Sequence, residues 1–86
     1  FKPGLVAEQV NYISGVPFSG PTQVTAKIRS AAPRVKATAT PLENQRLQVL
    51  FEEPQRAITP GQAVVLYDGD QVLAGGTIAD VIEKVG

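Results

Sequence analysis

Apolar and polar residues alternate along most of this chain. The pattern extends over six segments: residues 5–13, 24–29, 35–40, 46–52, 63–67 and 71–74. In one of them Leu47, Val49 and Phe51 share a parity, with polar residues between them for most of its length. A period of two is typical of a β-strand with one buried face, whereas a helix repeats every 3.6 residues. We therefore expect five or six short strands.

Proline and glycine separate these segments instead of gathering in one linker. Thr59-Pro60-Gly61-Gln62 has Pro and Gly at the positions that a type II turn favours. Asp68-Gly69-Asp70 lies between two strand-like segments and is the clearest hairpin signal in the chain. Gly75-Gly76 inside a strand-like region predicts a bulge or a sharp bend, as the corner of a barrel requires.

Residues 77–85 fit two patterns. Their apolar positions recur at helical spacing: Ile78, Val81, Ile82 and Val85. Thr77 and Asp80 resemble a capping box, which also favours a helix. A barrel, however, needs a closing strand here, because an open edge invites aggregation. We predict a strand, with a helix as the alternative, and an all-β fold: a small antiparallel β-barrel of about six strands.

The parity of the alternation also predicts which side chains fill the interior. The expected core comprises Val24, Ile28, Val35, Leu47, Val49, Phe51, Val64 and Leu66. A slip of one residue would exchange the two faces of a strand, so the placement of Val64 and Leu66 depends on the register. Phe51 and Tyr67 lie within strands and are expected to pack in the core. Tyr12 and Phe18 lie nearer a loop, where stacking on a nucleic-acid base stays open.

The composition excludes several kinds of active site. The chain has no Cys and no His, so it has no disulfide, no thiolate, none of the commonest zinc ligands and no imidazole base. It also has no glycine-rich phosphate loop. Asp68 and Asp70 come nearest to an oxygen-ligand metal site, but a tight turn explains their spacing better. We expect one domain, residues 1–86, with no metal site and no catalytic residues.

The charges balance overall but are unevenly placed. The chain has 8 Lys and Arg against 8 Asp and Glu, and no acidic residue occurs from Gln9 to Leu42. Four cations fall within ten positions of this stretch: Lys27, Arg29, Arg34 and Lys36. A hairpin around residues 30–33 would bring them together on one outer face. They are candidate contacts for RNA phosphates, and the alternative is a solvated face that keeps the barrel soluble.

Three segments of the chain together resemble a known family. They are VNYISG at residues 10–15, VTAKIRS at 24–30 and FEEPQRAITPGQAVVLYDGDQVLAGGTI at 51–78. In order and spacing they resemble the C-terminal domain of the tRNA-specific 2-thiouridylases, over nearly the whole chain. The resemblance implies a β-barrel similar to the second domain of elongation factor Tu. Ser30-Ala31-Ala32-Pro33 departs from the family's pattern, because these residues are small and apolar where relatives are aromatic or polar.

The resemblance also implies what a parent enzyme does. Such enzymes adenylate the wobble uridine of certain tRNAs with ATP and Mg²⁺, and they replace its 2-oxygen with sulfur. Their nucleotide loop and two catalytic cysteines lie in a preceding domain, so none of those residues can be assigned here.

The chain begins at Phe1 and has no Met, and we expect it to be excised from the C-terminus of such an enzyme. The expected partners are tRNA, the other domains of the enzyme and a sulfur-relay donor protein. No apolar run approaches the ~20 residues of a membrane span, so the expected compartment is the cytosol. The leading hypothesis is an accessory domain that assists tRNA docking. The alternative is a non-catalytic structural or protein-interaction barrel.

Overall fold

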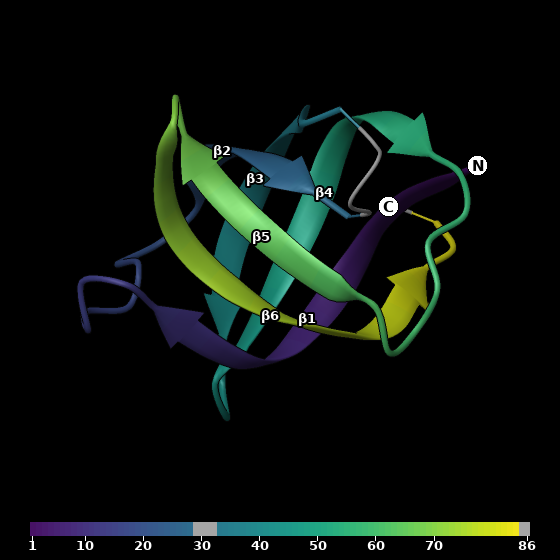
Figure 1. Ribbon diagram of the computed structural model, residues 1–86. Coiled ribbons are helices and arrows are strands. Elements are labelled where there is room, and N and C mark those ends of the chain that lie inside the picture. The colour runs from purple at the N-terminus through teal and green to yellow at the C-terminus, as the bar shows by residue number, and fades with distance from the viewer. Residues whose placement is uncertain (29–32, 85–86) are drawn as a thin grey trace.

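The computed structural model describes residues 1–28 and 33–84, which form six β-strands and no helix (Figure 1). The strands are β1 (Lys2–Tyr12), β2 (Thr22–Lys27), β3 (Val35–Leu42), β4 (Arg46–Gln55), β5 (Ala63–Asp68) and β6 (Gln71–Ile82). Every neighbouring pair is antiparallel, and the order β1-β4-β3-β2-β5-β6 closes on itself as a barrel. The predicted fold class is confirmed.

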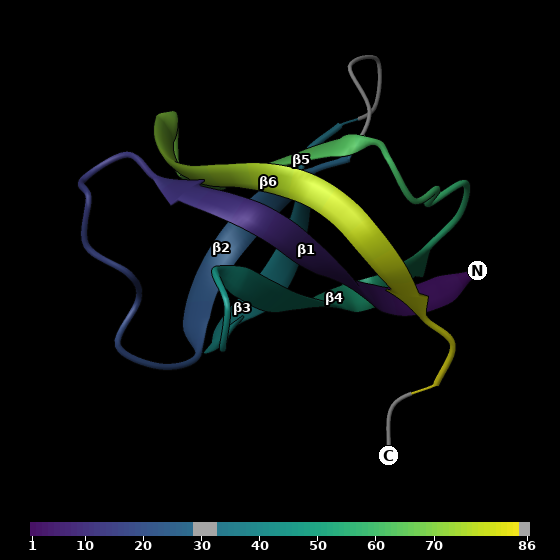
Figure 2. The same cartoon turned by 90° about the horizontal axis from the view of Figure 1, so that it is seen from below.

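Residues 77–82 of the segment that fitted two patterns belong to the strand β6, while Val85 lies outside the described residues. A bulge explains the helical spacing of Ile78 and Val81. β6 lies beside β1 along most of its length (Figure 2). Ile78 pairs with Ala7 and Val81 with Leu5, but the register shifts by one residue between these pairs. Ala7 and Leu5 are both fully buried, so Ile78 and Val81 lie on the inner face although they are three residues apart. The bulge at Ala79 therefore imitates a helical repeat.

The interior of the barrel is apolar. Seven of the eight predicted core residues are buried: Val24, Ile28, Leu47, Val49, Phe51, Val64 and Leu66. Val35 is only partly buried and packs against the core from its margin. The prediction that Tyr67 packs in the core is wrong, because its neighbour Leu66 takes the inner face and Tyr67 points outward. No polar or charged residue is buried within the described part of the chain.

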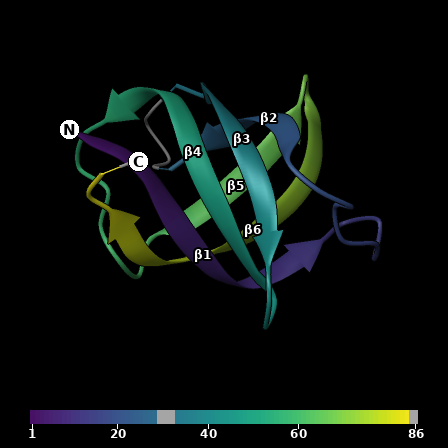
Figure 3. The same ribbon diagram turned by 180° about the vertical axis from the view of Figure 1, so that it is seen from behind.

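The remaining core positions are mostly small. They comprise Leu5, Ala7, Val10, Ala26, Ala37, Ala39, Ala74 and Ile78. A six-stranded barrel has a narrow lumen, and small residues between large ones let the side chains fill it. Figure 3 shows the three neighbouring strands β1, β4 and β3, which contribute many of these residues.

The predicted turns are present. Gly61 has φ +94°, and the Gln62 N–H donates to the Thr59 carbonyl over 3.2 Å, as in a type II turn. Asp68 pairs with Gln71 across a two-residue loop, with Gly69 at φ +59°. A residue other than glycine would be strained at both positive-φ positions.

The predicted irregularity at Gly75-Gly76 lies where β1 and β6 change register. The shift falls between Glu8 and Asn11 of β1, where Gln9 has φ +52°. The bulged strand approaches Gly76 so closely that an added Cβ would lie 2.9 Å from the Glu8 carbonyl oxygen. The glycine at position 76 thus accommodates a neighbouring backbone.

Candidate nucleic-acid interface

The hairpin of β2 and β3 places the candidate cations on the outer surface. Thr25 pairs with Lys36 and Ala26 with Val35, so the two strands run side by side as the spacing predicted. Ala26 and Ile28 are buried, which leaves Lys27 between them on the outer face, partly exposed. Lys36 is exposed, as is Arg34, while Arg29 lies outside the described residues.

Arg34 is engaged by the hairpin that joins β5 and β6. Its Nη1 donates to the Gly69 carbonyl over 2.7 Å, and its Nη2 contacts Asp70 Oδ1 at 3.1 Å. Its guanidinium carbon lies 4.4 Å from the centre of the Tyr67 ring, a stacked cation–π arrangement. These contacts bridge the shortest ladder of the barrel, the three residue pairs between β2 and β5. Arg34 is therefore a structural link as well as a surface cation.

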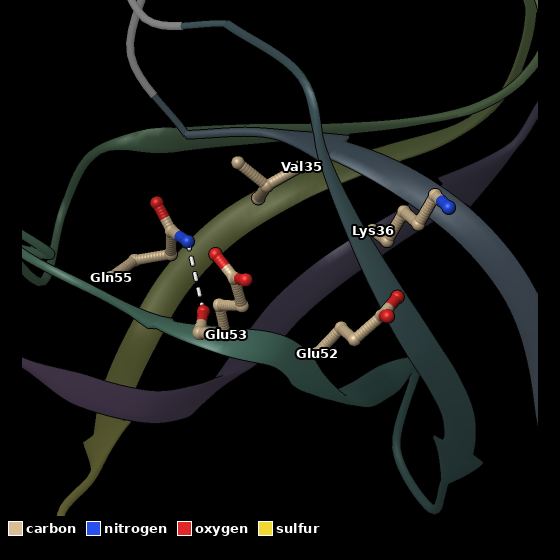
Figure 4. Close-up of a pocket in the computed structure, with 5 residues that line it drawn as sticks. All are labelled: Val35, Lys36, Glu52, Glu53 and Gln55. Atoms are coloured by element: carbon tan, nitrogen blue, oxygen red, sulfur yellow. Dashed lines mark hydrogen bonds between the residues drawn. The ribbon is translucent and has the colours of Figure 1, made fainter.

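Lys36 borders a groove where β3 and β4 separate (Figure 4). The ladder between these strands ends at Ala37 and Phe51, and the residues beyond it line a groove of about 320 Å³. The lining residues are Val35, Lys36, Glu52, Glu53 and Gln55. The Gln55 side-chain amide donates to the Glu53 carbonyl over 2.8 Å, which braces the end of β4.

A second groove of about 390 Å³ continues from Lys36 across β2 to the end of β5. Lys36 and Glu52 line both grooves, and Asp68 lines the second. The outer face is thus mixed in charge. Neither Lys27 nor Lys36 forms an ion pair with any described residue, although carboxylates border the grooves around Lys36. The two lysines are available to an anionic partner, and the nearby acids limit how strongly they attract it.

Three of the aromatic side chains, Tyr12, Phe18 and Tyr67, offer little for base stacking, whereas Phe1 is 80% exposed. The outer face of Tyr67 already carries the Arg34 guanidinium. Tyr12 and Phe18 pack edge to face, with ring centres 5.0 Å apart, against the margin of the core. Burial raises the pKa of Tyr12 above its ordinary value, and a backbone hydrogen bond with Phe18 opposes this in part.

The resemblance implies that ATP with Mg²⁺ binds elsewhere in the parent enzyme, and its absence from the described residues of this domain stays a prediction. They contain no group of three carboxylate, His or Cys side chains that could hold a metal ion. The chain also lacks the glycine-rich loop that cradles phosphates. No helix in residues 1–28 and 33–84 is long and apolar enough to cross a membrane.

Comparison with known proteins gives consistent matches. A family model described as the aminomethyltransferase beta-barrel domain matches residues 2–78. The chain is similar to tRNA-specific 2-thiouridylase MnmA of Clostridium perfringens, with 49% identity over 82 residues, 95% of this chain and 23% of the relative. It is 50% identical to the protein of the same name from Halalkalibacterium halodurans over 84 residues, 98% of this chain and 23% of the relative.

The protein of that name from Roseiflexus castenholzii is 53% identical over 75 residues, 87% of this chain and 20% of the relative. The chain thus spans a fifth to a quarter of the length of these curated relatives. The matches confirm the resemblance to the barrel domain of the 2-thiouridylases. With most of its residues matched by one model, the chain belongs to the aminomethyltransferase beta-barrel domain family.

Proposed function

We propose that the chain is a non-catalytic domain of a tRNA 2-thiouridylase and that its β2–β3 face assists tRNA docking. About half of its residues are identical to those of proteins with that name. The observation that carries the docking role is the pair Lys27 and Lys36, which lie outward on adjacent strands without a carboxylate partner among the described residues. Arg29, two residues after Lys27, would extend the same set.

The docking contribution is small on physical grounds. Two phosphate contacts give a salt slope of about −2, and a third brings it to about −3. The chain has zero net charge, and Glu52, Glu53 and Asp68 border the same face. The isolated domain should bind RNA no more tightly than ~10⁻⁴ M, the weak end of non-specific affinity. It would help to orient a tRNA that other domains hold.

The rest of the proposed activity belongs to other parts of the enzyme. The parent would adenylate the wobble uridine with ATP and exchange its 2-oxygen for sulfur supplied by a relay protein in the cytosol. This chain has neither the cysteines nor the phosphate loop that the family uses, so we assign no step of that reaction to it. Its proposed part is limited to positioning.

The test is tRNA binding by the full-length enzyme with Lys27→Gln and Lys36→Gln together. We expect weaker binding to every tRNA alike and a salt slope about 2 units shallower, because phosphate contacts carry no sequence information. The matched control, Arg56→Gln with Lys84→Gln, removes the same charge from exposed cations outside the β2–β3 face. Equal slopes in the two double variants would overturn the docking role.

The alternative function is a structural or protein-interaction barrel. The engagement of Arg34 by Asp70 and the acids beside Lys36 favour it, because both reduce the positive potential of the face. Under this alternative the Lys27 and Lys36 variants bind tRNA normally. The salt-dependence experiment therefore distinguishes the two functions.

A further inference from the structure

A third groove, of about 280 Å³, lies at the other end of β2 and β3 from the cations. Residues of the loop that joins β1 to β2 and of the turn that joins β3 to β4 line it. Figure 2 shows the course of this loop and this turn. Its lining includes Tyr12, Pro17, Pro41, Leu42 and Arg46. We call this region the apolar end. Arg46 is the one charged side chain among the lining residues.

Three exposed aliphatic side chains belong to the two segments that form this groove, and Leu42 is the one of them that lines it. Ile13 is 62% exposed, Val16 68% and Leu42 39%. Ile13 and Val16 belong to the loop that forms one wall of the groove, and Leu42 belongs to the other wall. Single exposed apolar residues are ordinary, but a group of them beside a hollow marks a surface that contacts another molecule. Among the described residues only two other large apolar side chains, Phe1 and Val72, are comparably exposed.

The walls of the apolar end are held in place by specific backbone contacts. The Val10 N–H donates to the Gln45 carbonyl over 2.9 Å and fastens the turn to β1. Asn44 and Gln45 have φ of +60° and +58°, and Gln9 has +52°, conformations that residues other than glycine adopt at a cost. Three of the four such residues in the described chain thus lie at this end. A strained backbone persists where the surrounding structure enforces it, often at functional sites.

We propose that the apolar end docks against another domain of the full-length enzyme. This inference rests on the proposed function, because it requires the chain to be part of a larger 2-thiouridylase. The curated relatives are four to five times longer than the region they share with this chain, so each contains ample protein to supply the partner surface. The partner surface would be apolar, with a carboxylate facing Arg46.

The chemistry of the apolar end favours a protein over RNA. Its exposed residues are aliphatic, whereas single-stranded RNA is held by exposed aromatic rings and cations. Protein interfaces combine an apolar centre with a polar rim, and Arg is enriched in them relative to the rest of the surface. Because a covalently tethered domain has an effective concentration in the millimolar range, a contact of a few side chains suffices for docking.

The two candidate surfaces are separate. Lys27 and Lys36 lie toward the loop that joins β2 to β3, while the apolar end lies at the opposite ends of the same strands. The barrel could therefore contact the enzyme at one end and leave the cations free to face tRNA. Loss of one surface should leave the other intact.

The experiment measures amide hydrogen exchange of the full-length enzyme without tRNA. In the variant with Val16→Asp and Leu42→Asp, a segment outside the barrel should exchange about tenfold faster or more, because its docked cover is lost. The control is Phe1→Asp, which changes an 80% exposed side chain beside Arg56, at the end of β4 opposite the groove. It should leave exchange outside the barrel unchanged. Slow exchange of β4 and β6 in both variants shows that the barrel stays folded.

Three results would overturn the proposal. The first is unchanged exchange outside the barrel in the variant with Val16→Asp and Leu42→Asp. The second is self-association of the 86-residue chain that these substitutions abolish, which would make a second copy the occupant. The third is slowed exchange of residues 11–17 only when tRNA is added, which would make RNA the occupant. Because the main measurement contains no tRNA, its failure is distinct from failure of the docking role of Lys27 and Lys36.

Discussion

Two adjacent glycines of β6 differ in what surrounds them, and replacing each by alanine should give opposite results. A Cβ on Gly76 would lie 2.9 Å from the Glu8 carbonyl oxygen and 3.2 Å from Val10 Cγ2. A Cβ on Gly75 would meet only the Val64 carbonyl oxygen, at 3.6 Å. Real Cβ atoms essentially never approach a neighbour within 3.0 Å, and the obstacle at Gly76 is backbone that cannot rotate away. Only the Gly76 substitution forces β1 to move.

The magnitudes follow from two opposing terms. Overpacking destabilises the folded state by about 1–3 kcal/mol. Replacing glycine by alanine also lowers the conformational entropy of the unfolded chain, which stabilises the fold by about 0.4–1 kcal/mol. Gly76→Ala should therefore lower the free energy of unfolding by about 1.3 kcal/mol for mid-range values of both terms, and by about 2.6 kcal/mol at most. Gly75→Ala pays no steric cost and should raise the free energy by up to about 1 kcal/mol. Each kcal/mol shifts Tm by about 4–8 °C in a domain of this size.

The assay is urea unfolding of the 86-residue chain followed by circular dichroism, with both variants and the parent at one pH. The two substitutions add the same methyl group to the same strand, so propensity and hydrophobicity cancel in the comparison. A Gly76→Ala variant that is as stable as Gly75→Ala would refute the reasoning. It would mean that the β1 backbone at the Gln9 bulge moves away from the added methyl group without loss of stability.

Three further predictions use the same unfolding measurement. Leu47→Ala should cost about 2–5 kcal/mol because the side chain is fully buried, and a loss below 1 kcal/mol would contradict the assigned core. Arg34→Gln should lower the free energy of unfolding by about 0.5–1 kcal/mol, because the stack on Tyr67 is lost. Asp70→Asn should change it little, because that carboxylate is almost fully exposed. Equal effects of the two substitutions would show that the ion pair dominates. Burial raises the pKa of Tyr12 above 10.0, so its contribution to stability is intact below pH 10 and declines as the pH rises through the folded-state pKa. The alkaline loss should be smaller in Tyr12→Phe, and an identical loss would exclude Tyr12 as its source.

The alternation of apolar and polar residues along the strands predicted most of the fold. Leu47, Val49 and Phe51 share one parity and are buried, and the alternation within residues 63–67 likewise separates the buried Val64 and Leu66 from Val65 and Tyr67. The same alternation places Tyr67 outside, so the expectation that it packs in the core is wrong: its ring is apolar, but its parity sets it on the outer face. Burial of a strand residue is set first by the face it occupies, since a one-residue slip would invert the whole strand.

The contacts of Arg34 could not be predicted from the sequence. Asp70 lies 36 positions away, and the two meet because β2 pairs with β5 to close the barrel. No local pattern specifies which strands become neighbours in a barrel. The spacing of cations along the chain predicted a shared outer face, but it carried no information about the carboxylates that other strands would bring to that face.

The filled interior confines any function of this domain to its surface. Alanines at positions 7, 26, 37, 39 and 74 let opposite walls of the barrel approach, so larger neighbours such as Leu5 and Leu66 occupy the lumen. Shallow grooves on the outside bind weakly, and they become effective only when a tether supplies a high local concentration. The face with Lys27 and Lys36 and the apolar end lie at opposite ends of β2 and β3. Because both surfaces belong to one rigid body, the binding free energies of two weak contacts add when both surfaces are engaged.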